Sequence, residues 1–234
     1  MTAPKVVTFD CAQTLMKVDW QPTRLAVRSA ELAGLEFDRQ VAGEIYDRKL
    51  GSRWPEFKEL NLKRDEAVLA GFWRELTADW LLEAGMPADR ADDVITEANN
   101  LLFGDSSEVF SVYDDVVPCL DRLTESGFRL AVISNWDNSL HRALRSFGLS
   151  DYFEVVIASL EEGVEKPDPA LFHIALEKLG VDPGDAAHVG DNPIDDLQAA
   201  RNVGMRGFLI DRERDERSDS VITSLSQLQE VLGS

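Results

Sequence analysis

Four groups of polar residues combine a carboxylate nucleophile with an anion-binding clamp. In chain order they are Asp10, Ser134 with Asn135, Lys166, and Asp191. Carboxylate oxygens suit Mg²⁺, which takes one or two carboxylates and keeps water and substrate phosphate oxygens as its other ligands. A serine hydroxyl and neighbouring amides can donate to phosphoryl oxygens, and a lysine supplies positive charge where negative charge develops. Since an aspartate can attack phosphorus itself and form an aspartyl-phosphate, the set predicts a phosphoryl-handling site.

Each of these residues, taken alone, also has an ordinary structural explanation. Asp10 fits a carboxylate in a turn, Ser134 with Asn135 fits a helix cap, and Asp191 fits an Asx turn. Lys166 fits a surface lysine. The functional interpretation therefore depends on whether the fold brings all of them to one place.

The strands and helices predicted around these residues indicate where the fold places them. Residues 6–9 read VVTF, a buried strand pattern that ends at Asp10. Further strands and helices then alternate, which predicts an α/β fold with a Rossmann-like parallel sheet and helices on both faces. The expected strands are 130–133, 155–157, 187–189 and 207–210, and the expected helices are about 113–125, one through 140–147, 169–179 and 196–203. Because the ends of parallel strands meet at one edge, the polar groups should converge there.

A different pattern fills residues 17–105, where apolar residues recur at steps of three and four, as in amphipathic helices. Four of the five tryptophans fall in this stretch, which indicates an aromatic core of its own. Residues 104–107 read GDSS, a small polar linker. We therefore predict an all-helical domain without strands, residues 17–105, inserted into a core formed by residues 1–16 and 106–234.

Composition narrows the class of partner. The chain has 234 residues, of which 44% are hydrophobic, enough for one core with a smaller inserted domain. Its net charge of -19, from 43 acidic and 24 basic residues, argues against nucleic acid and anionic membranes, which bind through Lys and Arg. We interpret this acidity as solvated surface in preference to adaptation to high salt. The partner expected is a small anionic molecule, and the oligomeric state is left open.

The cellular compartment is predicted from what the sequence lacks. No apolar run reaches about 18 residues, and no basic and apolar leader precedes the first strand. Only two cysteines, Cys11 and Cys119, could form a disulfide. This usage is typical of a reducing compartment, so we expect a cytoplasmic protein.

Four segments, in this order, resemble the motifs of the haloacid dehalogenase-like hydrolase superfamily: DCAQTL, VISN, EKPDPALF and HVGDNPIDD. The stretches RLAVISNWD and AAHVGDNPIDDLQAARNVGM are especially similar to the group of haloacid dehalogenase-like hydrolase domain-containing protein 3, also called Reg-2-like. The resemblance covers the whole chain. It implies a Rossmann-like catalytic core, a helical cap inserted after the first motif, hydrolase activity and a Mg²⁺ cofactor.

The resemblance implies a set of metal ligands. Asp10 corresponds to the nucleophile and to a Mg²⁺ ligand, and the carbonyl of Ala12 to a second ligand. Asp191 corresponds to the acidic metal ligand. Asp196 matches a later carboxylate of the same motif that acts behind the ligands, with Asp195 as the alternative.

The resemblance also implies the phosphate-binding groups. Ser134 and Asn135 correspond to the residues that bind phosphate, and Lys166 to the lysine that stabilises charge. Asp10, Ser134 and Lys166 would then form the catalytic set.

Two residues depart from the family pattern. Ala12 replaces the aspartate with which family phosphatases protonate the leaving group and then activate water, and Gln13 replaces the usual glycine. General acid and base catalysis contributes about 10² to 10⁴ in rate, so alkyl phosphates, with strongly basic leaving groups, should suffer most. Acyl phosphates, aryl phosphates and anhydrides should suffer least. We predict a Mg²⁺-dependent phosphatase of restricted scope, acting on a small phosphorylated metabolite.

Two other functions stay open at this point. A carbon-halogen or carbon-phosphorus hydrolase of the same superfamily does not need the second aspartate as an acid. Dehalogenases, however, do without the metal and usually have tyrosine at position 12, whereas phosphonoacetaldehyde hydrolases have alanine there. Phosphonoacetaldehyde hydrolases also need a lysine in the cap, for which Lys49 is the nearest candidate. They usually carry arginine at the position of Lys166. The remaining possibility is a catalytically weak protein that binds a phosphorylated ligand or a protein partner, although binding alone would not require a nucleophile.

Overall fold

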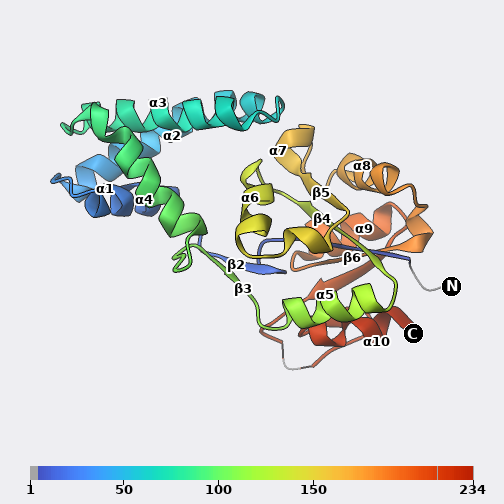
Figure 1. The fold of residues 1–234 in the computed structure, drawn as a ribbon. Coiled ribbons are helices and arrows are strands. Elements are labelled where there is room, and N and C mark those ends of the chain that lie inside the picture. The colour runs from blue at the N-terminus through green and yellow to red at the C-terminus, as the bar shows by residue number, and fades with distance from the viewer. Residues whose placement is uncertain (1–4, 215, 234) are drawn as a thin grey trace. The chain divides into compact units, whose positions relative to one another are not determined.

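The computed structural model describes residues 5–214 and 216–233, and its central element is a six-stranded sheet in the order β5-β4-β1-β6-β7-β8 (Figure 1). Each neighbouring pair in this sheet runs parallel. The strands are β1 (Val6–Phe9), β4 (Arg129–Ser134), β5 (Val155–Ala158), β6 (Ala186–Gly190), β7 (Arg206–Ile210) and β8 (Val221–Ile222). The α/β class and the parallel sheet predicted from the sequence are confirmed.

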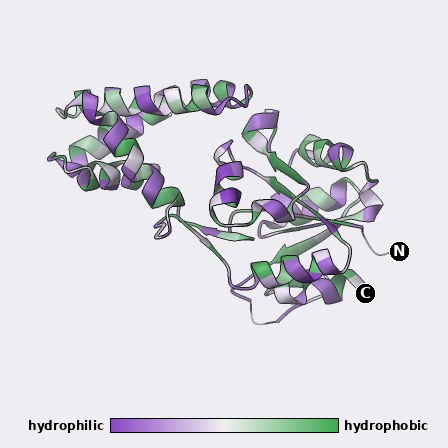
Figure 2. Cartoon of the chain, in the orientation of Figure 1, coloured by the Kyte–Doolittle hydropathy of each residue, from purple (hydrophilic) through white to green (hydrophobic). Residues whose placement is uncertain are grey.

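Helices cover both faces of this sheet, which explains why its central strands are buried along their whole length. All four residues of β1 and all five of β6 are buried, as expected for strands between two helical layers. In Figure 1, α8 (Pro169–Leu179) and α9 (Ala199–Asn202) lie on one side, and α5 (Val116–Glu125) with α10 (Leu228–Gly233) on the other. Figure 2 shows mainly hydrophobic strands and helices of mixed character. Two further helices are α6 (Ser139–Ser146) and α7 (Ser159–Glu162).

The chain divides into two compact units. One, the sheet unit, consists of the residues up to Val18 together with those from Ser111 onward, and contains the six-stranded sheet. The other, the helical unit, is Asp19–Phe110. Its helices are α1 (Pro22–Leu32), α2 (Arg39–Asn61), α3 (Glu66–Glu83) and α4 (Ala91–Phe103).

An aromatic cluster fills the helical unit. Trp80 is fully buried, its ring centroid lies 5.2 Å from that of Tyr46, and its indole N–H donates to the Ala42 carbonyl at 2.8 Å. Phe57 is also fully buried and packs against Phe72 with 5.2 Å between ring centroids. The side chains of these aromatic residues interlock α2 with α3, which stabilises the unit through apolar burial and edge contacts.

Several local predictions need correction. Trp20 is 45% exposed and does not belong to the aromatic cluster. The stretch predicted to lack strands begins with β2 (Met16–Val18), which pairs with β3 (Phe110–Val112). The helix expected from residue 196 is an α9 of four residues preceded by a π-helix, Pro193–Gln198. Strands of three residues are too short for their periodicity to be recognised.

Two further features concern the helices and the cysteines. None of the helices in the described part of the chain is long and apolar enough to cross a lipid bilayer. Both cysteines, Cys11 and Cys119, are buried and free, so they form no disulfide.

Candidate active site

The predicted site residues meet at one edge of the sheet, where β1, β4 and β6 end. Asp10 follows β1, Ser134 is the last residue of β4, and Asp191 follows β6. The register places Phe9 beside both Val132 and Val189, so these strand ends are level. This edge is where open parallel sheets bind ligands.

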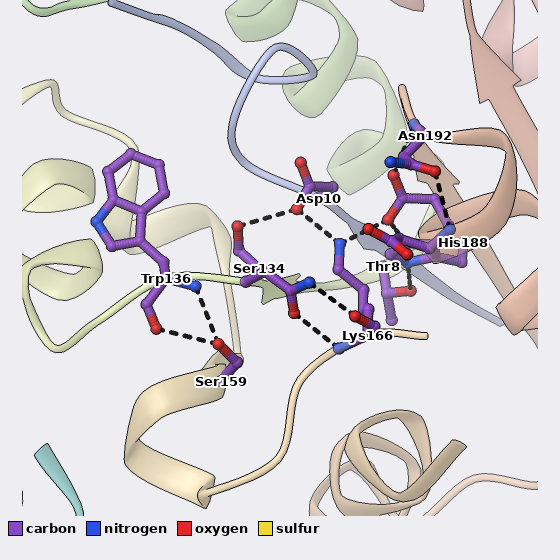
Figure 3. A network of polar contacts seen from close by, with 11 residues as sticks. Thr8, Asp10, Ser134, Trp136, Ser159, Lys166, His188 and Asn192 are labelled. Atoms are coloured by element: carbon purple, nitrogen blue, oxygen red, sulfur yellow. Dashed lines mark hydrogen bonds and ion pairs between the residues drawn. The ribbon is translucent and has the colours of Figure 1, made fainter. Parts of the chain in front are cut away.

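Asp10 is held by two donors from separate segments. The Ser134 hydroxyl donates to Asp10 Oδ1 at 2.9 Å, and Lys166 Nζ donates to the same oxygen at 2.7 Å (Figure 3). The side chain is almost entirely buried, at 6% exposure. Burial raises the pKa of Asp10, and the charge of Asp196 adds to this, against the opposing effects of Lys166 and Ser134. Oδ2 accepts none of the hydrogen bonds among the described residues, so it is the oxygen open to a cation or to phosphorus.

Lys166 lies between two carboxylates. Its Nζ is 2.7 Å from Asp10 Oδ1 and 2.5 Å from Asp196 Oδ1, and the residue is 4% exposed. Burial alone would lower the pKa of Lys166, but the charges of the two carboxylates outweigh it and raise the pKa. The amine is therefore a fixed positive charge at neutral pH.

Asn135 holds the main chain at Lys166. Its Nδ2 donates to the Lys166 carbonyl at 2.9 Å, and its Oδ1 accepts from the Lys166 N–H at 2.7 Å. Both ends of the carboxamide are thus occupied by Lys166. The phosphate-binding role expected of Asn135 would therefore fall to its backbone amide, while its side chain positions the lysine.

Asp196, and not Asp195, enters the cluster. The π-helix returns Asp196 to the end of β6, where its Oδ2 accepts from the Asn192 N–H at 2.9 Å. A Cβ at Gly190 would overlap the Asp196 carboxyl group, so only glycine permits this approach. Burial would raise the pKa of Asp196, but the hydrogen bond with His188 and the charge of Lys166 lower it.

His188 and Thr8 were not predicted as part of the site. They are neighbours across β1 and β6, both fully buried, with Thr8 Oγ1 2.7 Å from His188 Nδ1. His188 Nε2 is 3.1 Å from Asp196 Oδ1. Burial lowers the pKa of His188, which favours neutral imidazole. Since a carboxylate only accepts, Nε2–H donates to Asp196 and Nδ1 accepts from the Thr8 hydroxyl. Thr8 thus orients His188, and His188 holds the Asp196 carboxylate in place.

The acidic residues fit a divalent cation. Ligand atoms of Asp10, Asp191 and Asp196 all lie within 4.8 Å of one another. Asp191 is exposed to solvent as a residue, but its carboxyl group is partly desolvated. This desolvation, together with the charges of Asp10 and Asp196, raises the pKa of Asp191 to about 6. One lysine cannot balance three carboxylates, and hard oxygen donors are those that Mg²⁺ prefers. Among the described residues, no hydrogen bond reaches the Ala12 carbonyl oxygen, which leaves it available as a further ligand.

The residues that depart from the family pattern have a defined geometry. Ala12 offers only a methyl group, which transfers no proton. Gln13 adopts a left-handed backbone conformation with φ of 56°. Its Nε2 donates to the Val18 carbonyl at 2.9 Å, and its Oε1 accepts from the Tyr113 hydroxyl at 3.1 Å.

The replacement Lys166→Met should destabilise the protein by about 3–5 kcal/mol, because it leaves Asp10 and Asp196 buried without their counter-ion. Urea denaturation without divalent cations measures this. The matched control is Lys178→Met, which removes a more exposed ion pair with Glu162 and should cost about 1 kcal/mol or less. Equal losses in the two variants would show that the buried charge cluster does not stabilise the sheet unit.

The chain is similar in sequence to a family of hydrolases and to several known proteins. Residues 4–204 match the family described as a haloacid dehalogenase-like hydrolase. A zebrafish (Danio rerio) protein, haloacid dehalogenase-like hydrolase domain-containing protein 3, is 29% identical over 232 residues, 95% of this chain and 93% of its own. The glyceraldehyde 3-phosphate phosphatase of Methanopyrus kandleri is 30% identical over 210 residues, 86% of this chain and 81% of its own.

Solved structures show a related architecture. The chain is similar to the 2-haloacid dehalogenase of Pseudomonas syringae pv. Tomato DC3000, with a TM-score of 0.66 and 31% identity. The likeness covers 98% of each chain. Proteins similar to this chain thus include both phosphatases and dehalogenases, and the choice between these activities depends on the geometry of the site itself.

Proposed function

The chain belongs to the haloacid dehalogenase-like hydrolase family, and from this premise we propose that it is a Mg²⁺-dependent phosphatase acting through an aspartyl-phosphate on Asp10. The substrate proposed is a small phosphorylated metabolite. The observation that carries the proposal is the cluster of Asp10, Asp191 and Asp196 beside the buried cation Lys166. Such an excess of negative charge favours a divalent cation, and a cation there favours an anionic substrate.

The proposed mechanism assigns a task to each residue. A bound Mg²⁺, held by Asp10, Asp191 and the Ala12 carbonyl, would neutralise the substrate phosphate so that a carboxylate can approach it. Asp10 Oδ2, which accepts no hydrogen bond from the described residues, attacks phosphorus. Before substrate binds, the Ser134 hydroxyl and Lys166 hold Oδ1. With substrate bound, the single Ser134 O–H would turn from Oδ1 to a phosphoryl oxygen, and the third N–H of Lys166 would donate there as well.

The residues behind the site keep this arrangement fixed. Asp196 and Asn135 hold Lys166 from its side chain and its main chain, respectively. His188 in turn holds Asp196. Because these groups are already oriented, little reorganisation is needed when substrate binds.

We also propose that the helical unit is the cap that selects the substrate. Its basic residues Arg48 and Lys49 both pair with Glu83, and Arg53 pairs with Glu56. Their charges are thus compensated within the unit itself. Specificity should therefore depend on loops of this unit, where binding residues are usually found.

Carbon-halogen hydrolysis is the second candidate, favoured by the likeness to a 2-haloacid dehalogenase. The same Asp10 carboxylate would then attack carbon. Against it stands the acidic cluster, which a metal-independent reaction does not require. The carbon-phosphorus alternative needs a free lysine amine as nucleophile, whereas Lys49 Nζ lies 2.9 Å from Glu83 in an ion pair.

A substrate panel tests the proposal. Acetyl phosphate, p-nitrophenyl phosphate, phosphorylated sugars, chloroacetate and phosphonoacetaldehyde are assayed with Mg²⁺ and with EDTA. We expect phosphate release that needs Mg²⁺. Chloride release from chloroacetate that persists in EDTA, with no phosphate release from any ester, would establish the second candidate instead.

Metal binding gives a prediction that does not depend on turnover. Mg²⁺ at 100 times its dissociation constant should stabilise the folded protein by about 2.7 kcal/mol, seen as a rise in the thermal midpoint. Asp191→Asn should abolish most of this rise, because it removes the exposed carboxylate of the cluster. Asp195→Asn is the matched control, since Asp195 lies outside the cluster, and it should keep the rise. An equal rise in both variants would contradict the assignment of Asp191 as a ligand.

A further inference from the structure

The alanine at position 12 leaves open which group protonates the leaving-group oxygen. We propose that the Tyr113 hydroxyl is that proton donor, an inference that rests on the proposed phosphatase function. Tyr113 donates a hydrogen bond to Gln13 Oε1 at 3.1 Å, across 100 residues of sequence. It therefore places an ionisable O–H beside the residue that follows Ala12.

Tyr113 is tied to the loop after β1 at two points. Its hydroxyl binds Gln13, and its backbone N–H donates to the Leu15 carbonyl at 3.3 Å. Gln13 is itself fixed, because its Nε2 donates to the Val18 carbonyl at 2.9 Å. The hydroxyl thus has a defined position relative to Ala12, while the residue stays partly exposed and accessible to substrate.

The charges around Tyr113 suit a proton donor. The Arg212 guanidinium carbon lies 3.8 Å from the centre of the Tyr113 ring, where a cation stabilises the phenolate left after proton transfer. Arg212 is anchored by Asp115 at 2.9 Å and by the Thr14 carbonyl at 2.8 Å. Burial raises the pKa of Tyr113, the charge of Arg212 opposes this rise, and the charge of Asp191 adds to it, so the phenol is protonated at neutral pH.

The other candidates beside Ala12 fit less well. A carboxamide such as that of Gln13 carries no proton acidic enough to give to an alkoxide. Cys11 is fully buried, so its thiol is not accessible to a leaving group. Tyrosine is among the side chains that serve as general acids and bases.

In the proposed reaction, one proton moves from Tyr113 to the leaving group and one returns to Tyr113 from water. Asp10 Oδ2 forms a bond to phosphorus, the bond from phosphorus to the leaving oxygen breaks, and that oxygen takes its electron pair and the Tyr113 proton. The Tyr113 phenolate then removes a proton from the water that attacks the phosphorus of the aspartyl-phosphate. Phosphate leaves, and the Asp10 carboxylate and the Tyr113 phenol are restored.

Dependence on the leaving group tests this role. In Tyr113→Phe, kcat on an alkyl phosphate such as glycerol 3-phosphate should fall by about 10²-fold, the lower range for a positioned acid. On p-nitrophenyl phosphate, whose leaving group departs without a proton, Tyr113 stays protonated and forms no phenolate, so the loss of kcat should be much smaller. A merely structural role of Tyr113 would lower both values equally, and that result, or no loss on either substrate, would overturn the proposal. The matched control is Tyr152→Phe, which removes a hydroxyl bound to Asp121 and should change neither.

A double-mutant cycle separates this inference from the function on which it rests. With the usual acid restored by Ala12→Asp, a further Tyr113→Phe change should have little effect on glycerol 3-phosphate turnover, because the introduced carboxyl group then supplies the proton. If Tyr113→Phe lowered kcat by the same factor with Asp at position 12 as with Ala12, Tyr113 would not substitute for the missing acid. A wild-type protein without phosphatase activity on any ester would overturn the proposed function itself, whereas an active wild type with an unselective Tyr113→Phe loss would overturn only the proton donor.

Discussion

Replacement of Asp10 by asparagine should lower kcat on p-nitrophenyl phosphate by about 10³-fold or more, as expected when the nucleophile of a covalent mechanism is removed. Asparagine has nearly the shape of aspartate and keeps an oxygen for the Ser134 hydroxyl and Lys166. What it loses is the negative charge with which Oδ2 attacks phosphorus and contacts a cation. Steady-state kinetics with Mg²⁺ measure the effect.

Two controls make the Asp10→Asn result interpretable. Urea denaturation should show that the variant is folded, because Lys166 keeps its ion pair with Asp196. Asp137→Asn is the matched substitution. Asp137 follows the end of β4, where its carboxylate accepts a hydrogen bond from the Ser139 N–H at 2.7 Å. It does not belong to the acidic cluster. This variant should retain turnover. If Asp10→Asn retained turnover as well, a covalent intermediate on Asp10 would be excluded.

Restoration of an acid at position 12 has the second large expected effect. Ala12→Asp should raise kcat on alkyl phosphates within the range of about 10² to 10⁴ that a positioned acid contributes, less the part that Tyr113 already supplies. On p-nitrophenyl phosphate and acetyl phosphate the gain should be small, because these leaving groups depart without a proton. Ala12 is partly exposed, so a longer side chain can be accommodated there.

The comparison between substrates decides what Ala12 means. A gain confined to alkyl phosphates would show that the chain is a phosphatase limited by its acid-base step. Ala12→Gly is the matched control, since it changes the backbone freedom at this position without adding an acid. Equal gains on all substrates, or none, would mean that Ala12 marks a different reaction.

Much of the sheet unit could be predicted because its signals are local. The segments 6–9, 130–133 and 187–189 are mainly apolar, and the structure has strands at all three. Their order along the chain predicted that Asp10, Ser134 and Asp191 meet at one edge, and the structure places them there. The resemblance to the haloacid dehalogenase-like hydrolases is confirmed by the match over residues 4–204.

The parts that could not be predicted depend on contacts between distant segments. Thr8 and His188 alternate with core residues in their strands, and only the pairing of β1 with β6 reveals that they support Asp196. The contact between Gln13 and Tyr113 joins segments with no common pattern. Local periodicity predicts an element and its buried face, but not which polar side chains meet across the fold.

The most direct measurement is the capture of the intermediate. The protein is mixed with acetyl phosphate and Mg²⁺, quenched in acid at successive times, and its peptides are analysed by mass spectrometry. We expect one phosphoryl group on the peptide that contains Asp10, absent in EDTA and in Asp10→Asn. Turnover with no phosphoryl group on Asp10 at any time, or with the group on another residue, would contradict the account.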